Sequence, residues 1–251
     1  MIMNVEKITN EIVEFIRKYY KDNNLKGAVI GISGGKDSAV VAGLFVKALG
    51  CENVQGLWLP CHSKIEDKNN AYLVANHFGF DLKEIDLTNI YDNFVNENTN
   101  GIKDEYLIDA NINLKPRLRT ATLYYQAAML SRKSDATYIV PGTSNACELY
   151  VGYFTKGGDN VSDIMILANL SVREVIKIGE YIGVPDKVVH KTPDDGLSGL
   201  TDEEKLGFKY NDVEKVMKGE YVLDSIKQKI MKMHNQNKHK FITPTYKVKW
   251  D

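Results

Sequence analysis

Apolar and polar positions in the first half of the chain follow two periods in turn. Segments with helical spacing, in which apolar side chains recur every three to four positions, are residues 5–20, 39–49 and 66–78. Short apolar runs typical of buried strands lie at 28–30, 54–59 and 82–87. Strands that alternate with helices at this spacing predict an α/β fold with a doubly wound parallel sheet.

The second half is expected to extend this plan. The pattern predicts a helix that starts at Thr88, a loop over 96–104, a long helix over 113–132 and a fourth strand over 138–140. Residues 143–145 are expected to cap a further helix, which carries Glu148 in its first turns. Gly27 is expected to separate the lead-in helix from the first strand, and helices after residue 205 to pack on the sheet domain or on a second subunit. No internal repeat is present, so residues 1–251 are predicted to form one domain.

A glycine-rich turn, Gly31-Ile32-Ser33-Gly34-Gly35-Lys36-Asp37-Ser38, joins the first strand to the next helix. Backbone N–H groups and the helix dipole point at whatever binds at such a junction, which favours phosphate. Ser33 and Ser38 add hydroxyl donors, and Lys36 adds a positive charge. Asp37 fits an anion site mainly when a divalent cation lies between its carboxylate and the phosphates.

Two common phosphate loops do not fit this turn. The Walker spacing requires Ser or Thr after the lysine, where this chain has Asp37. The dinucleotide Gly-x-Gly-x-x-Gly pattern fails because Gly34 and Gly35 are adjacent. A turn that needs glycine only for its geometry is the alternative interpretation. The loop 61–63 after the second strand is expected at the same edge of the sheet, where it could line an adenine pocket.

Composition narrows the function classes. With 251 residues, 26% charged and 43% hydrophobic, the chain is typical of an ordinary globular protein. The net charge of −1 gives no overall attraction to nucleic acid, and no apolar run approaches the ~20 residues of a membrane span. The three cysteines are not spaced as Cys-x-x-Cys, and the first ten residues have no apolar signal core. We therefore expect a cytoplasmic protein without a zinc or iron–sulfur site.

The hexapeptide Ser-Gly-Gly-Lys-Asp-Ser at 33–38 resembles the pyrophosphate loop of the ATP pyrophosphatases, which adenylate a substrate and release pyrophosphate. Within that group, further segments are similar to the ammonia-dependent NAD synthetases. These segments are 113–117, 141–148, 152–159, 162–164, 191–197, 201–207 and 239–240. The resemblance covers residues 28–245 and implies a Rossmann-like fold of the adenine nucleotide alpha hydrolase type, with C-terminal helices.

The resemblance also implies a reaction. Such enzymes attach AMP from ATP to the nicotinate carboxylate of deamido-NAD (nicotinic acid adenine dinucleotide), and ammonia then displaces AMP to give NAD. Members that take ammonia from glutamine carry an extra amidase domain of roughly 200 residues, for which we see no room here. Free ammonia, or ammonia from a separate partner, is therefore the expected nitrogen source, and the family resemblance suggests a homodimer.

Individual residues match family positions. Those implied to contact ATP are Gly31, Ile32, Ser33, Gly34, Gly35, Lys36, Asp37, Ser38, Thr143 and Asp194, with Lys36 and Asp37 acting at the reacting phosphates. Those implied to hold magnesium are Asp37 and Glu148. Those implied to contact deamido-NAD are Arg117, Lys156, Asp163, His239 and Lys240.

From the residues alone, simpler interpretations stay open. Glu148 could be an acid in the first turn that the helix dipole stabilises, and Thr143 could be an N-cap. The basic residues could form surface salt bridges, and His239-Lys240 could belong to a mobile tail.

The chain departs from the family pattern at several places, of which two concern expected ATP contacts. Val172 stands where many relatives have a lysine that approaches ATP, and Arg173 or Lys177 could replace that charge. Asp194 stands where others have Thr or Ser. Another ATP pyrophosphatase, such as a tRNA-thiolating or GMP-forming enzyme, is an alternative, although paired cysteines and a basic face are missing. A non-catalytic nucleotide-binding module is the second alternative.

Overall fold

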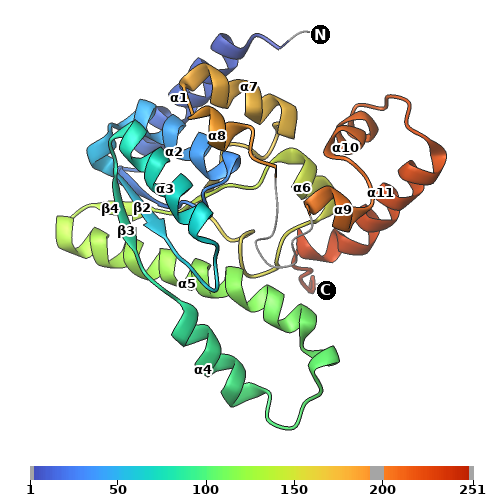
Figure 1. Cartoon of the computed structure of the whole chain (residues 1–251). Coiled ribbons are helices and arrows are strands. Elements are labelled where there is room, and N and C mark those ends of the chain that lie inside the picture. Colours follow the sequence, from blue (N-terminus) through green and yellow to red (C-terminus); the bar gives the residue numbers. More distant parts are fainter. Residues whose placement is uncertain (1–2, 193–200, 249–251) are drawn as a thin grey trace.

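The computed structural model describes residues 3–192 and 201–248 (Figure 1). The strands are β1 (Leu25–Gly31), β2 (Val54–Trp58), β3 (Asp81–Glu84), β4 (Thr137–Ile139), β5 (Pro141–Gly142) and β6 (Ile164–Met165). The helices of the sheet region are α1 (Val5–Asp22), α2 (Lys36–Leu49), α3 (Ile65–Phe78), α4 (Thr88–Asn98), α5 (Ile108–Ser134), α7 (Val172–Ile182) and α8 (Asp186–Val189). The remaining helices are α6 (Ala146–Val151), α9 (Asp202–Leu206), α10 (Tyr210–Met217) and α11 (Asp224–Asn237).

The main sheet is parallel with strand order β3-β2-β1-β4, which confirms the predicted fold class. Strand order reverses beside β1, because β2 and β3 lie on one side of it and β4 on the other. Such a switch point opens a crevice at the carboxyl ends of the strands. The phosphate loop, which follows β1, therefore lies at the place where this fold binds ligands.

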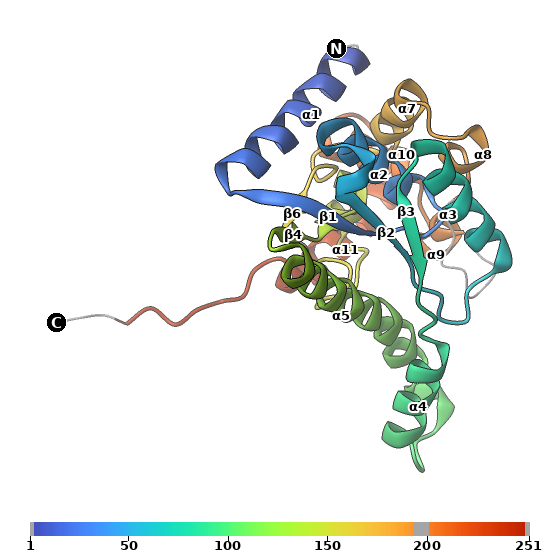
Figure 2. The ribbon, with the colours of Figure 1, turned by 90° about the vertical axis from the view of Figure 1, so that its left-hand side faces the viewer.

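Side chains of β1 alternate between two cores. Ala28 and Ile30 are fully buried in the larger core, together with residues of α1, α2 and α7. Val29 points into the second core, where it packs with residues of α5. Figure 2 shows α1, α2 and α7 on one side of the sheet and α5 on the other. Helices thus cover both faces, and near-continuous apolar residues in the central strand follow from that.

The C-terminal helices form a third core with α6. Cys147 and Val151 of α6 pack against Tyr210, Val213 and Ile230 from α10 and α11. The helices predicted after residue 205 therefore pack on their own domain. Figure 1 shows them on the far side of α6 from the main sheet. Among the described residues no helix is both long and apolar enough to cross a membrane.

Several predicted boundaries were wrong. Gly27 lies inside β1, where a Cβ would come within 2.4 Å of the Tyr138 ring, so close packing explains this glycine. The 96–104 loop is shorter than predicted, because α4 continues to Asn98. The long helix starts at Ile108 and contains Pro116 in its interior, a position that proline usually disfavours.

Candidate active site

A cavity of about 470 Å³ opens at the carboxyl edge of the main sheet. Its walls come from the phosphate loop, the end of β2 and the residues that follow it (57–63), α5, and residues 140–148. The loop 61–63 lies at this cavity, as the sequence predicted. The cavity therefore gathers segments that are more than one hundred residues apart in the chain.

The phosphate loop is shaped by its glycine and serine residues. Gly34 has a φ of +79°, and a Cβ there would lie 2.3 Å from the carbonyl oxygen of Asp67. The Ser38 hydroxyl accepts the N–H of Ser33 at 3.1 Å and donates to the carbonyl of Gly35 at 3.1 Å. Gly35 caps α2 without a side chain. The first-turn N–H groups of α2 thus face the cavity without a side-chain acceptor of their own cap.

Lys36 is a buried cation at the start of α2, with 4% of its surface exposed. Its Nζ lies 3.1 Å from Oδ2 of Asp37. Burial alone lowers the pKa of Lys36, but the carboxylates of Asp37 and Glu148 outweigh it, and the pKa is raised. The lysine therefore carries its charge wherever these carboxylates are ionised.

Glu148 belongs to the first turn of α6, which begins after the N-cap Asn145. Burial, and secondarily the negative charge of Asp37, raise the pKa of Glu148 to about 8. Thr143 lines the cavity and is not the cap of α6, so the N-cap alternative for Thr143 was wrong.

Asp37 and Glu148 suit a divalent cation that brings further ligands with it. Each carboxylate lines the cavity, and the charge of Asp37 adds to burial in raising the pKa of Glu148. Within residues 3–192 and 201–248, no three His, Cys, Asp or Glu side chains form a ready cluster for a metal ion. Magnesium commonly takes one or two carboxylates and completes its shell with phosphate oxygens and water. The donor set fits that chemistry, and the part of the chain that the structure describes does not form the full protein cage that calcium or zinc sites use.

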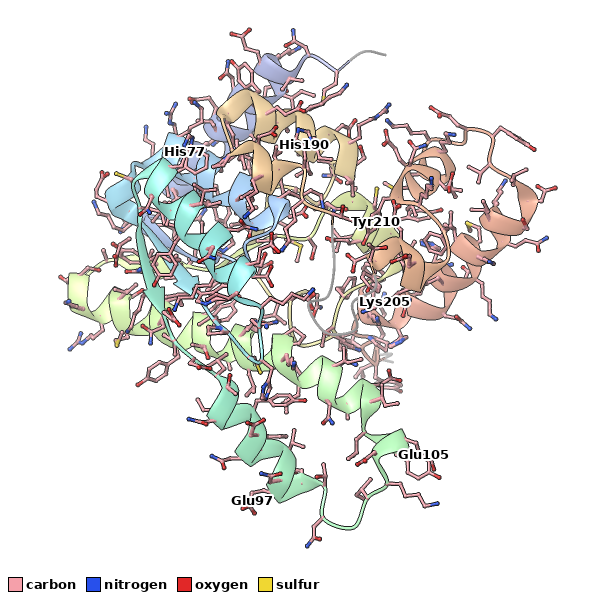
Figure 3. The ribbon with its side chains drawn as sticks, viewed as in Figure 1. His77, Glu97, Glu105, His190, Lys205 and Tyr210 are labelled. Carbon is pink, nitrogen blue, oxygen red and sulfur yellow. The ribbon has the colours of Figure 1, made fainter. Side chains whose placement is uncertain are left out.

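Asp202 is a third acid at the cavity that sequence reasoning missed. Its two carboxylate oxygens accept the hydroxyls of Tyr153 at 3.3 Å and Tyr210 at 3.4 Å. Figure 3 labels Tyr210 at the start of α10. Asp202 also contributes to the raised pKa values of Lys36 and Glu148. The two hydrogen bonds join α9 to α10 and to the segment after α6, and they hold the Asp202 carboxylate at the cavity.

The α5 wall presents two cations, Lys115 and Arg119. Lys115 is 7% exposed, its Nζ stands 5.3 Å from the centre of the Tyr91 ring, and burial lowers its pKa. The Nε of Arg119 donates to the Leu59 carbonyl at 3.1 Å. Their four-residue spacing places both on one face of the helix. The sequence analysis did not identify Arg119, although this spacing from Lys115 could have indicated it.

All five residues matched to deamido-NAD contacts lie outside the cavity lining. Four of them form a group that we call the outer basic row: Arg117, Lys156, His239 and Lys240. Nε and Nη2 of Arg117 donate to the Lys156 carbonyl at 3.3 Å. Nζ of Lys156 donates to the His239 carbonyl at 3.0 Å. Nζ of Lys240 donates to the carbonyls of Gly152 and Phe154 at 2.7 and 2.9 Å.

Asp163, the fifth of these residues, joins two strands at the sheet edge. Its carboxylate accepts the N–H of Val140 at 2.7 Å and the Tyr124 hydroxyl at 3.2 Å. The Asp163 N–H in turn donates to the Val140 carbonyl at 2.9 Å. Asp194 lies outside the described residues.

Many relatives have a lysine at the position of Val172, and neither of the two candidate residues on α7 replaces its charge at the cavities. Val172 lines a second cavity of about 240 Å³ that also contacts Lys36 and Lys191. Arg173 is paired with Glu214 at 2.6 Å, and neither it nor Lys177 lines either cavity. Lys191, by contrast, lines both cavities and forms an ion pair with Asp67.

Comparison with known proteins gives a consistent result. A family model described as NAD synthase matches residues 8–247. An NH3-dependent NAD(+) synthetase of Carboxydothermus hydrogenoformans is 40% identical over 215 residues, which cover 85% of this chain and 86% of that protein. The structure of an NMN synthetase from Francisella tularensis superposes with a TM-score of 0.87 and 31% identity, covering 98% of this chain and 100% of that one. An NH3-dependent NAD synthetase from Campylobacter jejuni, in complex with nitrate, gives a TM-score of 0.78 and 26% identity, with 98% and 100% coverage.

Proposed function

Because this chain belongs to the NAD synthase family, we propose that its cavity carries out the ammonia-dependent synthesis of NAD from ATP and deamido-NAD. The observation that carries the proposal is one cavity with two differently charged ends. A phosphate loop with Asp37 and Glu148 lies at one end, and Lys115 and Arg119 lie on the α5 wall. Such a cavity suits two polyanionic substrates that must meet.

The reaction takes place in two steps, adenylation and amidation. An oxygen of the nicotinate carboxylate attacks the α-phosphorus of ATP, the bond to the β-phosphate oxygen breaks, and pyrophosphate leaves. Ammonia then attacks the activated carbonyl carbon, AMP leaves with the bonding electrons, and the nitrogen loses a proton to give the amide. Adenylation is needed because a free carboxylate is a poor electrophile, and both steps need the repulsion between the anions to be offset.

We assign the phosphate end to ATP. The N–H groups at the start of α2, the hydroxyls of Ser33 and Ser38, and the charge of Lys36 hold the phosphates there. Thr143 lines the same cavity and is a further ATP contact in this proposal. Magnesium held by Asp37 and Glu148 would supply Lewis-acid stabilisation of the leaving pyrophosphate. Lys191 lines both cavities, as Lys36 does, and in this proposal it is the second cation that supports the phosphates.

We assign the α5 wall and the outer basic row to the nicotinate nucleotide. Arg119 joins the residues that the resemblance implied, because it faces the cavity while Arg117 lies outside the lining. Lys156 and Lys240 of the outer basic row belong to or contact the loop 152–159, and we assign this row, together with Asp163, to the part of the substrate that extends from the cavity.

The proposal includes a cytoplasmic homodimer in which residues 1–251 act as one synthetase domain and free ammonia serves as nitrogen source. Support for the dimer comes from α4 and α5, which project from the sheet together (Figures 1 and 2). Apolar side chains exposed on them and on the segment between them are Ile90, Phe94, Ile102, Tyr106, Ile108, Ile112, Tyr125 and Met129. An apolar surface that spreads over two helices is typical of a subunit interface.

A second candidate substrate is nicotinic acid mononucleotide. The NMN synthetase superposes with a higher TM-score than the Campylobacter jejuni NAD synthetase does. Its reaction would use the same phosphate end and the same two steps. The mononucleotide lacks the adenylate half of the dinucleotide, so the outer basic row would then have no part of the substrate to bind.

The test is a reaction of purified protein with ATP, magnesium, ammonium and either acid nucleotide. We expect NAD, AMP and pyrophosphate in equal amounts, with a larger kcat/KM for the dinucleotide. A preference for the mononucleotide would support the second candidate. Formation of AMP with neither nucleotide, in the presence of a different acceptor, would place the chain among the other ATP pyrophosphatases, and ATP binding that survives chelation of magnesium would support a non-catalytic module.

A further inference from the structure

Asn145 connects the two acidic residues at the phosphate end. Its side chain is fully buried, and its Oδ1 accepts the N–H groups of Cys147 at 3.0 Å and Glu148 at 3.1 Å. Its Nδ2 donates to Oδ1 of Asp37 at 3.2 Å. Its backbone N–H donates to Oε2 of Glu148 at 3.0 Å. One residue therefore contacts both carboxylates, although Asn145 and Asp37 are 108 positions apart in the chain.

The orientation of the Asn145 amide follows from these contacts. Two backbone N–H groups at the start of α6 require an acceptor, so the amide oxygen must face them. The NH2 group is then left pointing toward the α2 loop, where Asp37 accepts it. A flipped amide would set donor against donor at the cap and leave Asp37 facing an oxygen.

Capping alone does not require asparagine at this position. The helices α7 and α9 start with the same capping box, in which Ser171 and Thr201 use a hydroxyl and pair with a glutamate three residues later. Serine, threonine and aspartate all supply the capping oxygen. An amide adds an N–H donor beyond the cap, and that donor meets Asp37.

We propose that Asn145 is a positioning residue that fixes the Asp37 carboxylate relative to that of Glu148, so that the pair is arranged for a divalent cation before the cation and ATP arrive. The inference rests on the proposed function only in naming the metal–nucleotide complex as ligand. Two carboxylates without a cation repel each other, and a buried hydrogen-bond donor between them opposes their separation. Residues that orient metal ligands in this way typically change metal affinity by about 10- to 100-fold when removed.

The test compares Asn145→Ser, which keeps a capping oxygen and loses the amide donor, with Ser171→Ala as a matched loss of a cap whose residue lines neither cavity. Binding of Mn²⁺ is measured by electron paramagnetic resonance, in the presence of an ATP analogue with a methylene group between the α- and β-phosphates. We expect Asn145→Ser to weaken Mn²⁺ binding at least tenfold, and Ser171→Ala to leave it unchanged. In the pyrophosphate assay, Asn145→Ser should raise the half-saturating magnesium concentration more than it lowers kcat.

Asn145→Thr serves as the second variant if the serine substitution does not fold, because threonine also supplies a capping oxygen and likewise lacks the amide donor. An Asn145 variant that loses thermal stability and still binds Mn²⁺ as tightly as the wild type would show that the residue is only a cap, and the inference would be wrong. Failure of the proposed function is a separate result. In that case the wild type makes no NAD, yet the Asn145 variants still lose Mn²⁺ affinity.

Discussion

Charged side chains have different kinds of partner at the phosphate end of the cavity and in the outer basic row. At the phosphate end, Lys36 is paired with Asp37, and the charges are held next to one another inside the fold. In the outer basic row, Arg117, Lys156 and Lys240 donate to backbone carbonyl groups. The first arrangement keeps charges in place for a ligand, and the second uses charges to fasten the chain.

This difference indicates which parts of the chain fix the positions of the charged groups in each region. The phosphate end is preorganised by local geometry, since one turn and one helix start place most of its groups. The outer basic row joins α5, the loop 152–159 and the C-terminal residues 239–240, so a substitution there affects the loop as well as any bound substrate. Substitutions should therefore separate the two regions by their effects on rate and on stability.

The largest effect is expected from Asp37→Asn. Loss of the carboxylate to which we assign the metal should reduce pyrophosphate release by about 100- to 1000-fold. The fold should be retained, because the amide is isosteric and Asn145 can still form a hydrogen bond with its oxygen. Measurement of pyrophosphate release, alongside the circular dichroism melting curve, checks both points. An unaltered rate would refute the metal role of Asp37.

A smaller effect is expected from Arg119→Met, with Arg117→Met as the matched control on the same helix. Residues two positions apart on a helix point about 200° apart, so only Arg119 faces the cavity. A lost charge-assisted hydrogen bond is worth about 1.5–3 kcal/mol, which corresponds to a rise of about 10- to 100-fold in the KM for deamido-NAD. Steady-state kinetics show which of the two substitutions raises KM more. A larger KM effect for Arg117→Met would show that the outer basic row dominates substrate binding.

Lys240→Met should affect stability first. The substitution removes two hydrogen bonds to the carbonyls of Gly152 and Phe154, and with them the contact of Nζ with the Phe154 ring. We expect the free energy of unfolding to fall by about 1–3 kcal/mol, since both bonds involve a charged donor. Urea denaturation measures this loss. A KM that rises strongly at unchanged stability would instead assign Lys240 directly to the substrate.

The smallest effect is expected from Ser171→Ala. The cap of α7 contributes about 1 kcal/mol to stability, and Ser171 does not line the cavity. Its loss should lower the melting temperature by a few degrees without changing KM or kcat. Thermal denaturation and steady-state kinetics provide the comparison. A change in the magnesium dependence of this variant would remove the contrast with Asn145.

Local patterns in the sequence predicted the parallel sheet, the phosphate loop and the capped helix with Glu148, and the structure contains all three. The errors concern boundaries that tertiary contacts decide. Gly27 looked like a terminator and lies within β1, because the Tyr138 ring from a distant strand packs against it.

The sequence by itself determined the turn between β1 and α2, because the conformation of a glycine-rich loop depends on its own residues and their nearest neighbours. Only the tertiary structure decided that Arg119 faces the cavity, that Asp202 reaches it, and that Asn145 contacts Asp37. Each of these depends on how separate helices pack. Packing sums many weak contacts over distant parts of the chain, so short sequence patterns do not encode it.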